Sequence, residues 1–430
     1  MRNYIYYMAL GFSLLVPCFS AKARPLYVIR YSHLGVSDPL VQASSAKAEV
    51  FKAELERLTN GKMKVEIFPA GQLAGQVSSV QQIRKGTIHI ADISSGILAS
   101  LYYEPLEILD LPYIFSSRDI AREVLSKRNQ FIKNLINDCA DKTGIRILSL
   151  GIFGYRHTTN NVRPIRIPAD MFGLKMRTME IVPHMKMMEA WGATPVPVPW
   201  LELYTSLHTK VVDGEETTLQ NMIMGKMYQI QEYLTLTSHL MGVGAFLCNE
   251  KWLQSLPDDL KEDVILAEQN SLKTYDSFGK LLDAVALKKL KSYGMQVYKP
   301  TPEQEENFRR LALPYVRKWM EKKHGKEFFR DFFQSIENAG KKIDPGIKYQ
   351  WTYKGLINLL NVIVLKELGY KKAEKYKLTS DIMKNLRKKA VPSVRKLMEK
   401  RHGKDFVVEF FDAIEKAQSK LRNKPDVVPN

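Results

Sequence analysis

The sequence of 430 residues is poor in cysteine and lacks the short motifs that mark several large enzyme classes. Its three cysteines and eight histidines are scattered, and none of them has the close spacing of a zinc site. It contains no Gly-x-Ser-x-Gly nucleophile turn and no Gly-x-x-x-x-Gly-Lys phosphate loop. We therefore expect no catalytic residue, no metal site and no cofactor.

Long hydrophobic runs are also scarce, and the one that opens the chain is too short to span a membrane. An early arginine precedes an apolar run from Ile5 to Cys18, and the small-residue motif Ala21-Lys22-Ala23 follows. This order is typical of a secretory signal peptide, whereas a membrane helix needs about 20 apolar residues. We expect a mature chain that begins at Arg24 and lies in the periplasm. Lipidation of Cys18 is the alternative, which the preceding Pro17 disfavours.

Cys139 and Cys248 are the cysteines left after such processing. An oxidising compartment would permit a disulfide between them. Neither belongs to a closely spaced cysteine framework, so two separate buried thiols are the favoured interpretation.

Acidic residues are outnumbered, and the imbalance is concentrated at the C-terminal end. The formal net charge is +18, and residues 341–430 hold 22 Lys and Arg against 10 Asp and Glu. Such a region could contact nucleic acid or an anionic membrane surface. The predicted export argues against nucleic acid as a partner. Solvated faces of amphipathic helices are the favoured interpretation of the excess charge.

Strand-like and helix-like segments alternate through most of the chain. The first round predicts strands at 26–31, 64–68, 88–93 and 145–153, and helices at 43–58, 77–85 and 117–138. A second round predicts strands at 174–177 and 194–198, and helices at 182–191 and 201–207. This alternation favours an α/β fold with helices packed around a sheet. Two rounds predict two lobes, and a cleft between lobes is a common small-molecule site.

The C-terminal region repeats itself with an offset of 78 residues. Residues 314–333 read PYVRKWMEKKHGKEFFRDFF, and residues 392–411 read PSVRKLMEKRHGKDFVVEFF. A repeat this short cannot bury its apolar face alone. Leu356, Leu360 and Ile363 must therefore pack on the body, on another protomer or on a partner. Self-association through the second copy is one of the hypotheses that follow.

Two arginines and an acidic turn are the strongest signals of binding. Arg156 lies in the segment Gly-Tyr-Arg-His-Thr-Thr-Asn, and Arg177 ends the segment Gly-Leu-Lys-Met-Arg. The turn Asp213-Gly214-Glu215-Glu216 follows them. The planar fork of arginine donates two parallel, charge-assisted hydrogen bonds to a carboxylate. Either arginine could equally be structural when it is considered alone.

The order of these segments resembles the substrate-binding proteins of TRAP transporters, in the branch named for C4-dicarboxylate uptake. The resemblance runs from about residue 26 to about 340 and includes Val65-Glu66-Ile67-Phe68-Pro69 and Leu109-Asp110-Leu111-Pro112-Tyr113. It implies a two-lobe periplasmic binding protein fold that closes around a small organic acid. It also implies transient contact with the membrane subunits of a TRAP permease.

The resemblance implies roles for the binding signals. Arg177 matches the arginine that pairs with the carboxylate of the solute. Arg156 matches a second arginine, which either binds the same anion or forms a hinge ion pair with Glu215 or Glu216. Glu216 itself would accept a solute hydroxyl, hold a cation or orient Arg156. Thr217 stands where related proteins carry Asn or Trp, which puts both a sialic-acid pocket and a metal-bridged keto-acid pocket in doubt.

Four further residues are weaker candidates for solute contact. Ser94 and Ser95 follow a strand of the first lobe and face the expected cleft. His33 follows the first strand, although a structural histidine is the favoured interpretation. Trp200 would form an aromatic wall unless it belongs to the core.

The resemblance also sets expected boundaries along the chain. They are a signal peptide at 1–23, one lobe at 24–152 plus about 240–256, a second lobe at 153–239 plus about 292–310, a lobe-spanning helix at 257–291, C-terminal helices of the body at 311–345 and a duplicated helical appendage at 346–430. Two other functions stay open at this point. One is a carrier that presents the solute to a membrane receptor, and the other is an exported enzyme that uses the same cleft.

Overall fold

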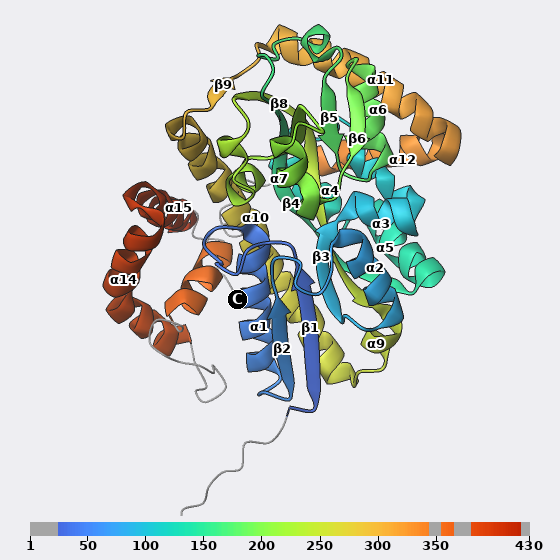
Figure 1. Cartoon of the computed structure of the whole chain (residues 1–430). Coiled ribbons are helices and arrows are strands. Elements are labelled where there is room, and N and C mark those ends of the chain that lie inside the picture. The colour runs from blue at the N-terminus through green and yellow to red at the C-terminus, as the bar shows by residue number, and fades with distance from the viewer. Residues whose placement is uncertain (1–24, 344–353, 365–379, 423–430) are drawn as a thin grey trace, which may run out of the picture.

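One mixed sheet runs through the whole molecule, and its two ends form two lobes (Figure 1). The structure is a computed structural model, and it describes residues 25–343, 354–364 and 380–422. The strand order is β2-β1-β3-β8-β4-β7-β5-β6, with β9 paired to β8. The strands are β1 Tyr27–His33, β2 Met63–Phe68, β3 Ile90–Ser94, β4 Ile145–Asn160, β5 Lys175–Thr178, β6 Thr194–Pro197, β7 Gly214–Thr218, β8 Tyr233–Asn249 and β9 Gln296–Tyr298.

Two long antiparallel strands, β4 and β8, carry the sheet from one lobe into the other. They pair from Ile145 and Asn249 at one end to Asn160 and Tyr233 at the other. The first lobe is built on β1, β2 and β3, and β3 pairs with the C-terminal part of β8. The second lobe is built on β5, β6, β7 and β9, and β7 pairs with the C-terminal part of β4. The chain therefore links the lobes through continuous hydrogen-bonded strands.

The register of β4 and β8 shifts midway, between Ile152 and Gly154. Gly154 has φ of 146°, and a Cβ there would lie 2.6 Å from Oδ2 of Asp283. Only glycine adopts this backbone conformation at low cost. A register shift of this kind bends a strand, so the sheet bends where it passes between the lobes.

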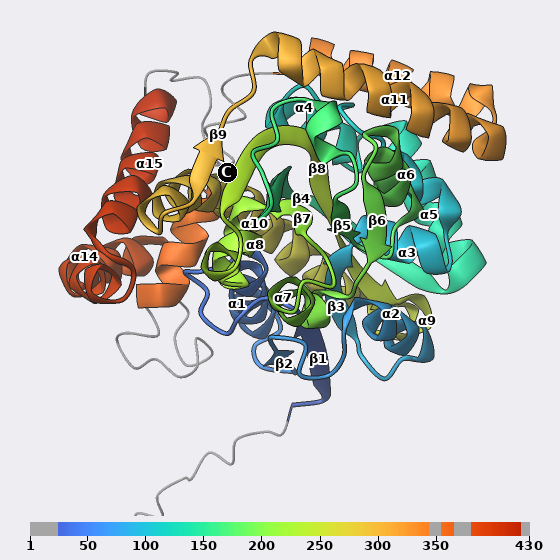
Figure 2. The same ribbon diagram turned by 45° about the horizontal axis from the view of Figure 1, so that its top comes forward.

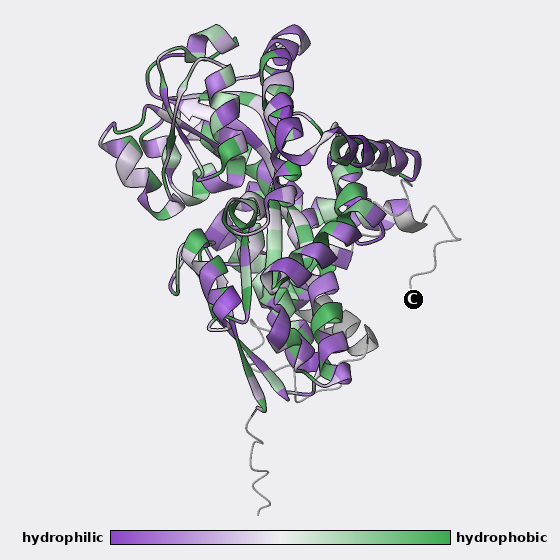
Figure 3. Cartoon of the chain, turned by 90° about the vertical axis from the view of Figure 1, so that its right-hand side faces the viewer, coloured by the Kyte–Doolittle hydropathy of each residue, from purple (hydrophilic) through white to green (hydrophobic). Residues whose placement is uncertain are grey.

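Helices cover both faces of the sheet (Figures 1 and 2). Hydrophobic and hydrophilic residues alternate along their ribbons, as expected for helices with one face on a core (Figure 3). They are α1 Ala43–Leu58, α2 Gln76–Lys85, α3 Ser95–Leu101, η1 Glu104–Asp110, α4 Arg118–Leu125, α5 Gln130–Thr143, η2 Pro168–Met171, α6 Val182–Ala190, α7 Trp200–His208, α8 Leu219–Met224, η3 Met227–Gln229, α9 Glu250–Gln254, α10 Asp258–Ser292, α11 Pro302–His324, α12 Lys326–Lys341, α14 Ser380–His402 and α15 Lys404–Arg422, with a further helical segment at 354–364.

Two predicted elements differ from the structure. The helix predicted at 117–138 is two helices, because the backbone is extended at Ser126 and Asn129 starts α5 by accepting a hydrogen bond from the N–H of Phe131 at 3.0 Å. The strand predicted at 145–153 continues to Asn160. Its second half pairs with β7 and β8, which lie far along the chain, so the local sequence does not reveal this extension.

The long helix α10 contacts elements of both lobes. It packs against α1 in the first lobe and against α8 in the second. Phe278 and Leu282 of α10 belong to the core of the first lobe, whereas Leu290 belongs to the core of the second. The helix therefore lies along the junction between the lobes, beside the bend in β4 and β8.

The second copy of the C-terminal repeat packs against α10, on the side of the molecule away from α11 and α12 (Figures 1 and 2). Leu356, Leu360 and Ile363 are buried in one cluster with Phe278. The apolar face that the sequence singled out is thus covered by the body of the same chain. Residues 344–353 and 365–379 and the predicted signal peptide lie outside the described residues.

The two cysteines confirm the prediction of separate thiols. Cys139 and Cys248 are both buried and free. Burial raises the pKa of the Cys139 thiol to about 12, which keeps it protonated and unreactive. Among the described residues, no helix is both long and apolar enough to cross a bilayer.

Candidate functional site

A cavity of about 60 Å³ lies between the two lobes. The first lobe contributes residues at the ends of β1 and β3 and at the starts of α1 and α2, and the second lobe contributes β5, β7, α7 and α8. Strand ends and helix starts meet here, which is where α/β folds commonly bind ligands. The lining residues are Leu34, Gly35, Gln42, Ser44, Gln76, Asp92, Ile93, Ser94, Phe153, Arg156, Arg177, Met179, Trp200, Thr217, Asn221 and Met224.

Arg177 of β5 lines this cavity and is only 1% exposed. Its Nε donates to the carbonyl oxygen of Val198 at 2.9 Å, and its Nη1 lies 3.8 Å from Oε2 of Glu215. Burial lowers the pKa of the guanidinium, because the charged form loses its hydration. Arg177 is thus a rigidly held cation in a poorly solvated place, and a bound anion would compensate its charge.

Arg156 of β4 also lines the cavity, but one edge of its fork is already occupied. Its Nε and Nη2 donate to the Glu216 carboxylate, and Nη2 lies 2.8 Å from Oε1. Nη2 also donates to the backbone oxygen of Glu216 at 2.5 Å. Burial disfavours the charge on Arg156, yet the Glu216 carboxylate raises its pKa. The ion pair expected as one alternative for Arg156 is therefore present, and it holds the side chain at the cavity wall.

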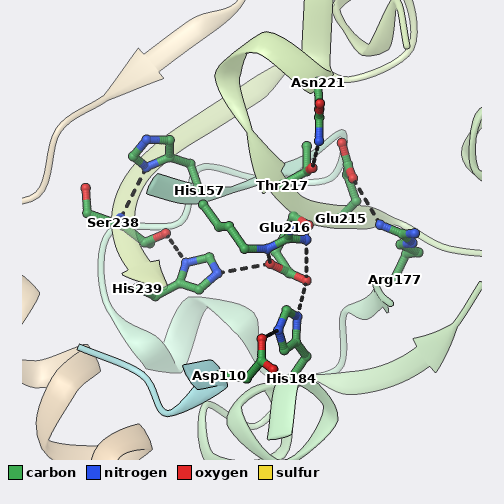
Figure 4. Close-up of polar contacts among 12 residues, drawn as sticks. Asp110, His157, Arg177, His184, Glu215, Glu216, Thr217, Asn221, Ser238 and His239 are labelled. Carbon is green, nitrogen blue, oxygen red and sulfur yellow. Dashed lines mark hydrogen bonds and ion pairs between the residues drawn. The ribbon is translucent and has the colours of Figure 1, made fainter. Parts of the chain in front are cut away.

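Glu216 lies behind Arg156 and does not line the cavity. Its carboxylate is fully buried and contacts His184 Nδ1 at 2.9 Å and His239 Nε2 at 3.2 Å, from separate sides (Figure 4). Despite burial, these neighbours and Arg156 hold the pKa of Glu216 well below its ordinary value. Arg156, His184 and His239 together engage both carboxylate oxygens of Glu216. Of the roles expected for Glu216, this geometry corresponds to the one in which its carboxylate orients Arg156.

The network behind Arg156 continues through a histidine. His184 lies on α6, and its Nε2 is 3.1 Å from Oδ1 of Asp110 at the end of η1. Burial alone would lower the pKa of His184, but Glu216 and Asp110 raise it. A carboxylate from the first half of the chain thus anchors the helix that braces Glu216.

Glu215 is the neighbour of Glu216 on β7, and its surroundings are different. Both of its carboxylate oxygens are buried without a hydrogen-bond partner among the described residues. Burial raises the pKa of Glu215 to about 7, although Arg177 and Arg156 act in the opposite direction. Arg177 is the nearest cation, and Figure 4 shows the two side chains directed at each other.

The remaining predicted residues divide into two groups. Ser94, Thr217 and Trp200 line the cavity, and Nδ2 of Asn221 donates to the hydroxyl of Thr217 at 3.3 Å. Ser95 and His33 do not line it. Ser95 is buried at the start of α3, and burial lowers the pKa of His33 to about 4, as for a neutral structural histidine.

The sequence interpretation missed five polar residues of the cavity, which are Gln42, Ser44, Gln76, Asp92 and Asn221. Asp92 did leave a signal, because it is the only charged residue of β3, whose five residues are all buried. An unexplained carboxylate in a buried strand points to a site. The other four residues lie at or near the starts of helices, and nothing in the local sequence distinguishes them.

Two lobes joined by long strands, with a cavity walled by buried arginines between them, define a protein that encloses a small ligand. Comparison with known proteins narrows this class. The chain belongs to the family described as bacterial extracellular solute-binding protein, family 7, whose model matches residues 37–323. That family consists of solute receptors and not of enzymes, and the two-lobe α/β fold that the sequence predicted is confirmed.

Similar proteins include a solute-binding protein of Verminephrobacter eiseniae, which is 32% identical over 249 residues, 58% of this chain and 73% of its own length. The C4-dicarboxylate-binding periplasmic protein DctP of Rhodobacter capsulatus is 29% identical, over 71% of this chain and 89% of its own. The crystal structure of the sugar acid binding protein of Advenella mimigardefordensis with galactonate has a TM-score of 0.68 and 28% identity. It covers 73% of this chain and 98% of that one.

Proposed function

We propose that this protein binds a small organic acid in the periplasm and delivers it, chemically unchanged, to the membrane subunits of a TRAP-type permease. The observation that supports the proposal most directly is Arg177, a buried arginine that lines the cavity between the lobes. Similar proteins named for a C4-dicarboxylate and for a sugar acid support the same chemistry.

The mechanism follows from the arrangement of the cavity. Both lobes contribute to its wall, so a bound solute contacts both and favours the closed arrangement. Arg177 pairs with the solute carboxylate, and Arg156, held by Glu216, supports the same anion from β4. A charge pair is much stronger in this poorly solvated site than in water. The membrane subunits of the permease would then recognise the closed, solute-bound form of the protein.

The test of this proposal is the affinity of solute-stripped protein for carboxylic acids, measured by calorimetry. Arg177→Ala should weaken binding by about 2–5 kcal/mol, the range for removing one partner of a buried charge pair. Arg177→Lys should recover only part of the affinity, because lysine lacks the planar fork.

Arg128→Ala is the matched control, since Arg128 is an exposed arginine paired with Glu123 away from the cavity. It should bind like the wild type. Unchanged affinity in a folded Arg177→Ala protein would contradict the assignment of Arg177. Conversion of the acid into another compound during incubation would contradict the role as a carrier.

A further inference from the structure

A second cavity, of about 260 Å³, lies beside the bend of the sheet and shares no described lining residue with the cavity that contains Arg177. Its wall consists of residues 148–152 of β4, residues 268–276 of α10, the helix α4 with the turn that follows it, and the end of the first repeat copy at Lys342 and Ile343. The function proposed above does not use this cavity.

Apolar atoms make up most of the wall of this second cavity. The aliphatic residues that line it are Leu125, Leu148, Leu150, Ile152, Leu272 and Ile343. Leu148 and Leu150 of β4 are only 2% and 3% exposed, whereas Ile343 is 36% exposed, so the strand forms the base and Ile343 lies near the mouth. A concave apolar base that opens to solvent is suited to the hydrocarbon part of a ligand.

Four carboxylates also line the second cavity, and all of them are paired within the protein. The pairs, at 2.8 to 3.5 Å, are Asp119 with Arg122, Glu123 with Arg128, Glu268 with Lys47, and Asp276 with Arg122 and the N–H of Ile152. These acids therefore leave little negative charge uncompensated at the wall.

Three lysines of the same wall are not compensated in this way. Lys127 follows α4, Lys273 lies on α10 and Lys342 follows α12, and none of them forms an ion pair with a described carboxylate. Nζ of Lys273 donates to the side-chain oxygen of Asn270 at 3.1 Å. Burial, with the neighbouring Lys354, lowers the pKa of Lys273, so a bound anion would stabilise its charged form.

We propose that this cavity binds a medium-chain fatty acid, with its hydrocarbon chain on the leucines of β4 and its carboxylate between the three lysines. An aliphatic chain buries the apolar base, and the carboxylate supplies the anion that the lysines lack. A neutral alcohol of the same length leaves the lysines unmatched, and an amine adds a like charge. The proposal does not depend on the proposed function, because the two cavities are separate.

The test uses octanoate, 1-octanol and octylamine as probes of equal chain length. Calorimetry with the full chain, stripped of solute and below the micellar concentration of the probes, should show octanoate binding about tenfold more tightly than octanol, and octylamine more weakly still. Arg177→Ala separates this site from the other cavity, since octanoate affinity should stay within about threefold of wild type when Arg177 is absent.

The double variant Lys127→Glu, Lys342→Glu reverses two charges of the wall at exposed positions. It should weaken octanoate about tenfold and leave octanol within about twofold of wild type, because only the carboxylate is affected. Lys396→Glu with Lys400→Glu is the matched control, since both lysines are exposed on α14 and neither lines this cavity. Leu272→Trp fills the apolar part and should weaken octanoate and octanol together.

Four results would overturn the inference. They are no octanoate binding by the full chain, equal or tighter binding of octanol or octylamine, octanoate binding that is lost in Arg177→Ala, and wild-type octanoate affinity in the folded double variant. None of these results bears on the proposed function, which is measured with different acids. Loss of binding of those acids in Arg177→Ala would in turn leave the second cavity untouched.

Discussion

Glu215 and Glu216 are adjacent on β7, yet opposite faces of the strand give their carboxylates opposite surroundings. Glu216 meets Arg156, His184 and His239, and its pKa is held well below the ordinary value. Glu215 meets Arg177 at 3.8 Å and no hydrogen-bond donor among the described residues, and burial raises its pKa to about 7. One carboxylate is thus a fixed anion that positions an arginine, whereas the other titrates near neutral pH.

Glu215 should make the free energy of unfolding fall as the pH rises. The folded protein holds the Glu215 proton more tightly than the unfolded chain, so the stabilisation is complete below about pH 4.5 and is lost as the pH rises to about 7. Glu215→Gln removes this dependence. Relative to wild type, the variant should gain about 3 kcal/mol between pH 4.5 and 8, from 1.36 kcal/mol per pKa unit.

Urea unfolding at pH 4.5, 6 and 8 measures this difference. Glu337→Gln is the control, because Glu337 is exposed on α12 and should leave the pH dependence close to that of wild type. If the stabilities of Glu215→Gln and wild type stay parallel across this range, Glu215 is ionised in the folded protein and the account of its burial is wrong.

The element scale is clearest in the duplicated helices, where both copies dock through the same positions. Phe328 and Phe332 hold the ring of Phe131 at centroid distances of 5.2 and 5.3 Å. Their counterparts in the second copy, Phe406 and Phe410, each lie 6.2 Å from the ring of Phe278. The duplicated segment therefore has the same apolar docking face as the first copy, and this face packs against a different apolar surface, on α10.

The histidine that ends the first helix of each copy also contacts the body at an equivalent position, through a carboxylate. Nε2 of His324 lies 2.5 Å from a carboxylate oxygen of Glu107, and Nε2 of His402 lies 3.6 Å from one of Asp38. The loop after β1 supplies Asp38, so the second copy reaches the edge of the first lobe near the cavity. Each copy is therefore docked by a pair between its histidine and a carboxylate of the body, Glu107 for the first copy and Asp38 for the second.

Gly355 lets the helical segment 354–364 approach α10 closely. A Cβ at this position would lie 2.1 Å from the backbone oxygen of Lys273. Gly355→Ala should therefore destabilise the protein by about 1–3 kcal/mol, the usual cost of overpacking. Thermal or urea unfolding measures the change.

Gly340→Ala is the matched control in the first copy. Gly340 is exposed inside α12 and has no heavy atom within 4 Å of its Cβ position. Alanine should stabilise the helix there by about 0.5–1 kcal/mol. Equal effects of the two substitutions would show that the segment does not pack as closely on α10 as the structure has it.

At the scale of the whole molecule, the second copy covers the junction helix, and none of its described residues lines the cavity between the lobes. A stop after residue 345 should leave the affinity for the solute within about threefold of wild type. It should lower stability or promote association, because Phe278, Leu281 and Leu282 of α10 lose their cover. Calorimetry and light scattering measure the two effects.

Phe410→Ala supplements the truncation, since it removes one buried contact on Phe278 and keeps the rest of the cover. It should lose about 3–5 kcal/mol of stability and retain the affinity for the solute. Solute binding at least tenfold weaker in either protein, with the fold intact, would place the second copy in the binding machinery.

The sequence by itself determined the local elements and the class of the fold. Apolar residues at helical spacing predicted a helix over 43–58, and α1 has these bounds. Alternating strands and helices in two rounds led to the two-lobe α/β fold, and the scattered cysteines led to free thiols. These features depend on composition or on residues close together in the chain, so they can be predicted from the sequence alone.

Only the tertiary structure decided which polar groups line the cavity between the lobes. Arg156 and Glu216 are 60 residues apart and meet because β4 pairs with β7. That pairing turned Glu216 away from the cavity and occupied its carboxylate, which the sequence left open. Asp92 reaches the cavity only because the bend of β4 and β8 brings the two lobes face to face. Register and lobe geometry set these positions, because the groups that meet lie on strands far apart in the chain.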